Sequence, residues 1–316
     1  MKNEAIIPIR RPARSGAARF LSEMKRCRYL YLLIALPVVY IILFKYVPIY
    51  GIIIAFKDFD VFDGIFGSPW IGLQNFRDAF ADPDFWPTVK NTLLLGGYSI
   101  VFAFPMPVFL ALMINELNNS RYRKLIESTC CFPHFISMVA VISVMMNFLE
   151  KDGLINQLIV TLGGQSHSFM MDPAWFRPTY ILSDIWKDTG WNSIIYLAAL
   201  SSIDVQLYEA CSIDGGGRFA KMMHVTLPCI APTIVIMLIL RIGSIMTVSF
   251  EKVLLMQNPV TYATSDIIDT YVFRRGLSGS QFSYATAVGF FQSLIGLVFI
   301  LSANAIARKT SETSLW

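Results

Sequence analysis

The stretch from Tyr208 to Pro228, YEACSIDGGGRFAKMMHVTLP, is polar and charged, and it lies between two long apolar segments. Its beginning belongs to a segment, Val205 to Ile213, with the composition of a short helix. The glycines in Asp214 to Gly217 should end this helix, because glycine readily adopts turn conformations. Arg218 to Val225 can form a second short helix, which we expect Pro228 to stop. The stretch predicts a helix-turn-helix element at a membrane surface, exposed to a soluble partner.

The composition on either side of this stretch is that of a membrane protein. Hydrophobic residues make up 55% of the chain and charged residues only 15%. A bilayer core about 30 Å thick needs roughly 20 apolar residues per helix. Six segments meet that length, and none shows the alternation typical of spanning strands. We therefore predict an all-α polytopic membrane protein with six transmembrane helices, at residues 29–56, 91–115, 128–149, 180–203, 229–256 and 276–307.

The distribution of basic residues predicts the orientation of these helices, because cytoplasmic loops are enriched in Lys and Arg. The segment before the first helix contains Lys2, Arg10, Arg11, Arg14, Arg19, Lys25, Arg26 and Arg28, and the loop after the second contains Arg121, Arg123 and Lys124. The loop after the first helix is acidic instead, with Asp58, Asp60, Asp63, Asp78, Asp82 and Asp84. Both termini and the loop 204–228 are therefore expected on the cytoplasmic side. The net charge of +4 follows from this pattern and requires no nucleic-acid partner.

The polar stretch resembles a known motif. Glu209-Ala210, Asp214-Gly215 and Leu227-Pro228 have the spacing of the "EAA" loop in permease subunits of bacterial binding-protein-dependent type I ABC importers. The chain departs from the pattern at Cys211 and Gly216, where alanine is usual, and at Met222, where an aromatic residue is common. These replacements are small or apolar, so we expect the turn to remain intact.

The likeness extends from Tyr29 to Arg308. The first outer loop, with Ser68-Pro69-Trp70, Gly72 and Asn75-Phe76, resembles permeases of the carbohydrate branch. This branch includes maltose permeases and permeases for oligosaccharides and polysaccharide fragments such as alginate or pectin pieces. The resemblance implies that the substrate is an oligosaccharide.

The resemblance also implies partners and a location. The chain would pair with a second, related permease in the bacterial plasma (inner) membrane, with two ABC ATPase subunits on the cytosolic side and an extracytoplasmic substrate-binding protein outside. The ATPase would contact the cytosolic loop, for which the expected coupling residues are Glu209, Ala210, Asp214, Gly215, Arg218, Leu227 and Pro228. The expected organisation is a basic N-terminal segment 1–28, a first helix 29–56, an outer loop 57–87, a permease core 88–306 containing the loop 204–228, and a tail 307–316.

The chain itself is not expected to be an enzyme. It has no G-x-x-x-x-G-K-[ST] sequence, and no Lys-Ser or Lys-Thr follows Gly215 to Gly217. ATP and Mg²⁺ should therefore bind to the partner ATPases. The three histidines, His134, His167 and His224, are scattered over different segments, so we expect neither a cofactor nor a metal in this chain.

Charged residues within apolar segments indicate a cavity or an ion pair, because they are costly in lipid. Lys187 could pair with Asp184, one helical turn away, or with the neighbouring Asp188. Arg241 and Glu251 are ten residues apart, so each should find another partner or line water. Aromatic and hydrogen-bonding residues suit a sugar path, and the candidates are Trp186, Trp191, Asn192, Tyr196, Arg241, Ser244, Thr247 and Glu251. The same residue types also serve in ordinary helix packing, and the substrate contacts could lie wholly on the partner permease.

An alternative function is a secondary transporter or channel that works without ATP. Asp184, Arg241 and Glu251 would then be ion-coupling residues. Such a protein would be expected to show internal sequence repeats, and none is visible.

Overall fold

The computed structural model describes residues 27–117 and 119–310, and the chain divides into two compact units, residues 1–53 and 54–316. From Arg28 on, the described part of the first unit is helical, with α2 (Arg28–Ile41), a π-helical turn (Ile42–Tyr46) and the start of a 3-10 segment (Val47–Phe56). The helical run Arg28–Phe56 has 29 residues, enough to cross a bilayer. The predicted helix at 29–56 is thereby confirmed as a helix of membrane-spanning length. The predicted N-terminal segment and tail fall mostly outside the described residues.

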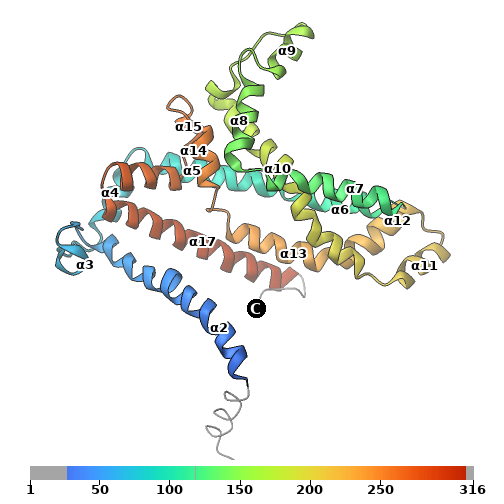
Figure 1. The fold of residues 1–316 in the computed structure, drawn as a ribbon, viewed down its shortest axis with the longest axis horizontal. Coiled ribbons are helices and arrows are strands. Elements are labelled where there is room, and N and C mark those ends of the chain that lie inside the picture. Colours follow the sequence, from blue (N-terminus) through green and yellow to red (C-terminus); the bar gives the residue numbers. More distant parts are fainter. Residues whose placement is uncertain (1–26, 118, 311–316) are drawn as a thin grey trace, which may run out of the picture. The chain divides into compact units, whose positions relative to one another are not determined.

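The second unit is also built from helices (Figure 1). They are α3 (Gly64–Gly67), α4 (Gln74–Ala81), α5 (Phe85–Tyr98), α6 (Pro105–Asn115), α7 (Ser120–Cys131), α8 (Met138–Leu149), α9 (Leu154–Thr161), α10 (Pro173–Ser201), α11 (Val205–Ile213), α12 (Arg218–Lys221), α13 (Leu227–Gly243), α14 (Phe250–Met256), α15 (Tyr262–Ser265), α16 (Ile268–Val272) and α17 (Phe282–Thr310). Within the described ranges the only β-type pairing is an isolated bridge between Lys57 and Trp70. The all-α prediction is confirmed.

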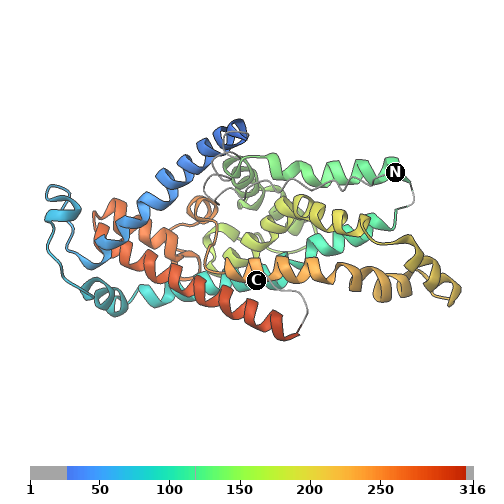
Figure 2. The ribbon, with the colours of Figure 1, turned by 90° about the horizontal axis from the view of Figure 1, so that it is seen from below.

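The number of spans agrees with the prediction when bent helices are included. Four helical runs in the described chain are long and apolar enough to cross a membrane, and two further pairs of helices pass the same test if each bent pair is one span. The second predicted helix corresponds to α5 and α6 joined by the π-helical turn Ser99–Ala103, and the sixth to α17. In Figure 2, α13 and α17 run side by side, and these two helices pack against each other.

The third predicted helix, 128–149, is not continuous, and this prediction was wrong. The run Ser120–Phe135 meets the run Met138–Thr161 at an angle of 95°, and α8 and α9 leave the direction of α7 in Figure 1. The break follows the short 3-10 turn Phe132–Phe135, which contains Pro133. Proline cannot donate a backbone hydrogen bond and disfavours a continuous helix around it.

A buried lysine satisfies the backbone that this break exposes. Lys187 Nζ donates hydrogen bonds to the carbonyl oxygens of His134 at 2.8 Å and Ile136 at 2.7 Å, and more weakly to that of Pro133 at 3.4 Å. The expected ion pair of Lys187 with Asp184 or Asp188 does not form. The free carbonyl groups at the end of a helical segment carry partial negative charge, so they provide an alternative site for an ammonium group.

The fifth predicted helix, 229–256, ends earlier than expected. α13 stops at Gly243, and the chain continues without regular helix until α14 begins at Phe250. The intervening backbone lies against α5, since a Cβ atom built on Gly96 would lie 2.2 Å from the carbonyl oxygen of Ile245. The apolar sequence therefore contains a non-helical segment between α13 and α14, which crosses α5 and which the composition does not reveal. We call this segment the non-helical crossing.

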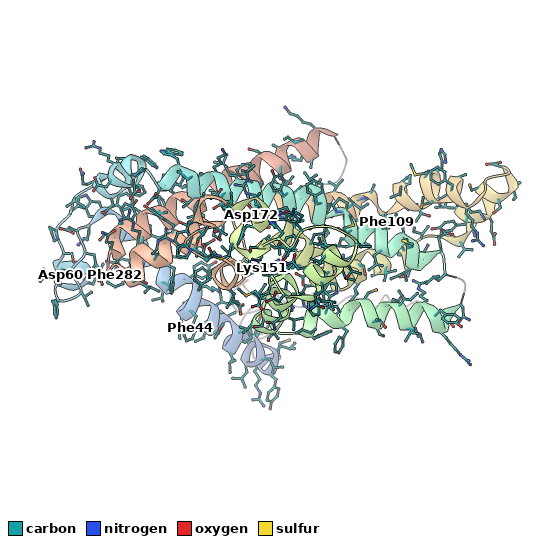
Figure 3. All side chains as sticks on the ribbon, turned by 90° about the horizontal axis from the view of Figure 1, so that it is seen from above. Phe44, Asp60, Phe109, Lys151, Asp172 and Phe282 are labelled. Atoms are coloured by element: carbon teal, nitrogen blue, oxygen red, sulfur yellow. The ribbon has the colours of Figure 1, made fainter. Side chains whose placement is uncertain are left out.

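α10 is the central helix of the second unit and contacts α6, α7 and α13. Its N-terminal half belongs to the largest buried cluster, where Phe176, Tyr180 and Ile181 pack with Leu95 of α5 and Val253 of α14. The side chains fill the space between the helices, as Figure 3 shows. Asp60 and Phe282 lie at one end of this view and Phe109 lies toward the other. The arrangement places one face of α10 inside the bundle.

Candidate functional site

The first candidate site is the helix-turn-helix element formed by α11 and α12. α11 leaves α10 at an angle of 70°, and the side chain of Asp204 caps it by accepting a hydrogen bond from Gln206 N at 2.9 Å. Gly215 has a φ of +80°, a conformation that favours glycine, and it ends α11. The predicted turn at Asp214-Gly215 is confirmed.

Two of the three departures from the usual motif, Cys211 and Gly216, are in direct contact. A Cβ atom added to Gly216 would lie 2.5 Å from Cys211 Sγ and 2.7 Å from its carbonyl oxygen. The amide of Gly216 donates to that carbonyl at 2.8 Å, which holds the two residues together. A side chain at position 216 would therefore meet both the backbone and the side chain of Cys211.

The prediction that Pro228 ends the second short helix was wrong. α12, the turn Met222–Thr226 and α13 form one helical run, Arg218–Gly243, and Pro228 lies within it. The turn is π-helical, and the amide of Leu227 donates to the carbonyl of Met222, five residues earlier. A wider turn of this kind accommodates a proline ring that would clash in a regular α-helix.

The loop presents polar and apolar side chains together. Glu209, Ala210, Asp214, Gly215 and Arg218 are all exposed, Leu227 is half-buried and Pro228 is exposed. Two large apolar side chains beside them are also exposed, Ile213 at 87% and Phe219 at 71%. In Figures 1 and 2 this loop lies at the end of the bundle opposite α3 and α4. Exposed apolar residues among charged ones are typical of a surface that a partner protein covers.

The second candidate site is a polar interior between α5, α6, α10 and α13. Two cavities of about 270 Å³ each meet there and share the residues Asp184, Asp188, Arg241 and Ser244. Asn192 and Tyr196 line the first cavity, and Thr247 lines the second. Five of the eight predicted path residues are thus brought together: Asn192, Tyr196, Arg241, Ser244 and Thr247.

A row of α10 side chains supplies much of the polar lining. Tyr180, Asp184, Asp188, Asn192 and Tyr196 are spaced four residues apart and all line one or both cavities. Residues four apart are neighbours on an α-helix, and a row of them turns gradually around the helix axis. The two aspartates and Tyr180 were missed as path residues, although this spacing was visible in the sequence.

The two aspartates each have a specific partner. Asp184 Oδ1 accepts a hydrogen bond from Lys252 Nζ of α14 at 2.5 Å. Lys252 is only 1% exposed, also donates to the carbonyl of Tyr180 at 2.7 Å, and lies 3.9 Å from the centre of the Tyr180 ring. Asp188 Oδ1 lies 2.8 Å from His134 Nδ1.

Arg241 is the remaining cation of the cavity lining. It occupies the last turn of α13, and its Nη2 donates to the hydroxyl of Ser99. Among the described residues no carboxylate lies within ion-pair distance of its guanidinium. Placing such a charge in a membrane helix costs about 2.5–3.5 kcal/mol on the insertion scale, and a position in a cavity, where water or a ligand can reach the guanidinium, lowers this cost.

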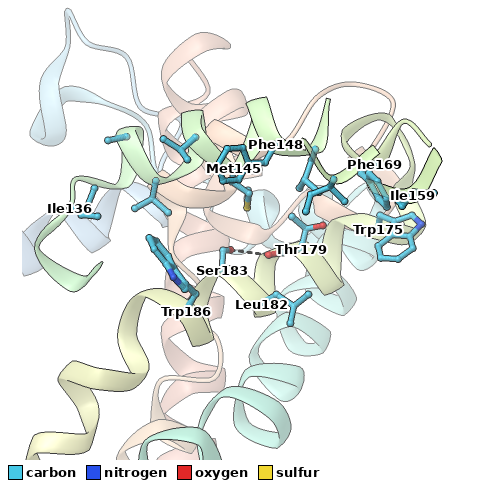
Figure 4. A pocket seen from close by; sticks show the side chains of 15 residues that line it. Ile136, Met145, Phe148, Ile159, Phe169, Trp175, Thr179, Leu182, Ser183 and Trp186 are labelled. Carbon is cyan, nitrogen blue, oxygen red and sulfur yellow. Dashed lines mark hydrogen bonds between the residues drawn. The ribbon is translucent and has the colours of Figure 1, made fainter. Parts of the chain in front are cut away.

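Three predicted path residues lie elsewhere. Trp191 stacks on His134 with ring centres 4.6 Å apart, and Glu251 is an exposed residue in the first turn of α14. Trp186 lines a separate apolar groove of about 730 Å³ between α8 and α10, together with Ile136 and Met145 (Figure 4). The tryptophans therefore pack against the broken third span.

A bundle of membrane-length helices that encloses charged cavities and presents an exposed loop at one end defines a membrane transport component. The chain belongs to the family described as binding-protein-dependent transport system inner membrane component, whose model matches residues 88–312. The prediction of an ABC importer permease is thereby confirmed.

Two relatives from Bacillus subtilis (strain 168) match almost the whole chain. Protein LplB is 43% identical over 298 residues, which cover 94% of this chain and 94% of LplB. The polygalacturonan/rhamnogalacturonan transport system permease protein YteP is 44% identical over 299 residues, which cover 94% of this chain and 93% of YteP.

Solved structures of an alginate importer show the same fold. One is a bacterial ABC transporter involved in the import of the acidic polysaccharide alginate, with 41% identity and a TM-score of 0.85 over 92% of this chain and 99% of that chain. Another is the bacterial alginate ABC transporter in complex with an alginate pentasaccharide-bound periplasmic protein, with 39% identity and a TM-score of 0.86 over 94% of this chain and 100% of that chain.

Proposed function

We propose that this chain is the translocating permease subunit of an ATP-driven importer for acidic oligosaccharides, such as fragments of alginate or pectin. The observation that carries the proposal is the 41% identity over 92% of the chain to the alginate importer permease. YteP, whose substrates are polygalacturonan and rhamnogalacturonan, points to the same class of sugar.

The exposed loop would couple the permease to ATP hydrolysis on two separate ATPase subunits, which would also hold ATP and Mg²⁺. The ATPase surface would cover Ile213 and Phe219, and Glu209 would make the polar contact. α11 is capped by Asp204, and Tyr208 OH lies 3.1 Å from Thr226 Oγ1, so the loop is tied to the base of α13. Movement of the ATPases would therefore move α13, which lines the cavities, as a rigid body. The chain itself would carry out no catalysis.

The cavities between α10 and α13 would form this subunit's share of the sugar path, completed by a second, related permease. Asn192, Tyr196, Ser244 and Thr247 offer hydrogen bonds to sugar hydroxyls. The basic N-terminal segment and the loop 204–228 would face the cytoplasm, as would both termini. Trp186, Trp191 and Glu251 remain predictions as path residues.

The opposite end of the second unit offers a surface for the substrate-binding protein. The loop from Lys57 to Trp70 is closed by a backbone bridge and is polar inside, where Lys57 Nζ donates to the carbonyl of Ile65 at 2.6 Å. It is apolar outside, where Phe62 is 98% exposed and Phe66 84%. Phe59 N donates to Ser283 Oγ at 2.8 Å, which anchors the loop to the start of α17.

The proposal is tested by uptake into proteoliposomes that contain this chain, the second permease and the ATPases. The binding protein is supplied outside the vesicles and loaded with a labelled oligouronate. We expect uptake to require both ATP and the binding protein. Glu209→Lys should abolish uptake and weaken copurification of the ATPase, because it reverses a charge at the contact. Tyr122→Lys, an exposed substitution on α7, is the control.

Uptake by this chain alone, driven by an ion gradient without ATP, would instead establish a secondary transporter. Uptake of neutral oligosaccharides in preference to oligouronates would support the permease function and refute acidic oligosaccharides as the substrate class.

A further inference from the structure

We propose that Arg241 recognises the carboxylate groups of the sugar in transit and thereby makes the path selective for acidic sugars. This inference rests on the proposed function and assigns its charge selectivity to one side chain of this subunit. It starts from the position of Arg241, which lines both cavities from the last turn of α13 and is exposed in them.

The other charged groups of the cavity region are already engaged. Asp184 is held by Lys252 at 2.5 Å, and Asp188 lies 2.8 Å from His134 Nδ1. The ammonium group of Lys187 is taken up by the carbonyl oxygens of the broken third span. Arg241 is therefore the cation in this lining without an acidic partner among the described residues.

The guanidinium group has donors left over for a ligand. It carries five N–H donors, of which the hydroxyl of Ser99 accepts one. Its planar fork matches a carboxylate with two parallel hydrogen bonds, which a neutral sugar hydroxyl cannot reproduce. A uronate unit supplies both the missing negative charge and the matching geometry.

The surrounding residues complete a site for the rest of such a sugar unit. Asn192 and Ser244 line the cavity beside Arg241 and can bond hydroxyl groups, and Tyr196 adds an aromatic ring. Asp188 can accept from a hydroxyl with its second oxygen. Asp184 is paired with Lys252 and Asp188 is hydrogen-bonded to His134, and neither aspartate forms an ion pair with Arg241.

The first test measures equilibrium binding of a labelled oligouronate and of its methyl ester to the purified transporter without the binding protein. We expect the wild-type transporter to bind the acid more tightly than the ester. Arg241→Gln should weaken binding of the acid about 10- to 100-fold, the effect of losing a hydrogen bond to a charged group, and leave the ester unchanged. The affinity of Arg241→Lys for the acid should lie between those of the wild type and Arg241→Gln, because lysine keeps the charge and loses the planar fork of donors.

The second test measures uptake and ATP hydrolysis in proteoliposomes. Arg241→Gln should lower oligouronate uptake while hydrolysis stimulated by the loaded binding protein stays at the wild-type level. Arg123→Gln, which removes a cation that pairs with Glu127 outside the cavities, is the matched control and should change neither quantity.

Three outcomes would overturn the inference. These are equal binding of acid and ester by the wild type, equal loss of both ligands in Arg241→Gln, and loss of the second permease from the purified variant, which would assign Arg241 to an ion pair between subunits. If the wild-type transporter shows no uptake that depends on ATP and the binding protein, it is the proposed function that fails.

Discussion

Single residues decide how charged groups are paired inside this bundle. Lys252 is almost completely buried and holds Asp184 at 2.5 Å, and it links α14 to α10 directly beside the cavities. A buried pair of this kind adds little net stability compared with apolar residues, yet removing one partner is costly because the other charge is left without compensation.

Lys252→Met should therefore destabilise the protein by about 3–5 kcal/mol. Thermal unfolding of the purified transporter should show a clear fall in Tm, and Lys124→Met, which removes an exposed lysine of α7, should not. The double variant Asp184→Asn, Lys252→Met should recover much of the loss, since no uncompensated charge remains. A double variant as unstable as Lys252→Met would contradict this account.

At the scale of elements, the segment between α13 and α14 packs on α5 through direct backbone contact, without a side chain between them. The non-helical crossing between α13 and α14 lies on α5 at Gly96, where an added Cβ atom would meet the carbonyl oxygen of Ile245 at 2.2 Å. The neighbouring Gly97 has no atom within 4 Å of the same construction. The two adjacent glycines therefore provide a test position, Gly96, and a matched control position, Gly97.

Gly96→Ala should lower stability by about 1–3 kcal/mol, the usual effect of overpacking, because backbone must move. Gly97→Ala should be neutral or stabilising, since alanine favours a helix interior over glycine. Both are measured as Tm in the same detergent. Equal Tm values for the two variants would show that the crossing does not contact α5 in the way described.

For the whole molecule, the two ends of the second unit face different compartments in the proposed function. In a cysteine-free background, Ile213→Cys should react with a membrane-impermeant maleimide only from the cytoplasmic side, and Phe62→Cys only from the outside. Both side chains are among the most exposed in the chain. The loaded binding protein should protect Phe62→Cys and leave Ile213→Cys unchanged. Labelling of both positions from one side would reverse or refute the topology.

Sequence alone determined what depends on composition and local pattern. The apolar segments predicted an all-helical membrane protein. Glu209 to Pro228 predicted an exposed helix-turn-helix, because a glycine turn and the exposure of a polar segment depend on residues that are adjacent in the sequence. The sequence also supplied five of the residues that line the cavities.

Only the tertiary structure decided where the helices break and which charges meet. The third span breaks after the turn that contains Pro133, and Lys187, more than fifty residues away in sequence, satisfies the carbonyl groups exposed there. Asp184 pairs with Lys252 across 68 residues, while Arg241 has no acidic partner among the described residues. An ion pair depends on which helix faces lie together in space, and hydropathy along the chain does not contain that information.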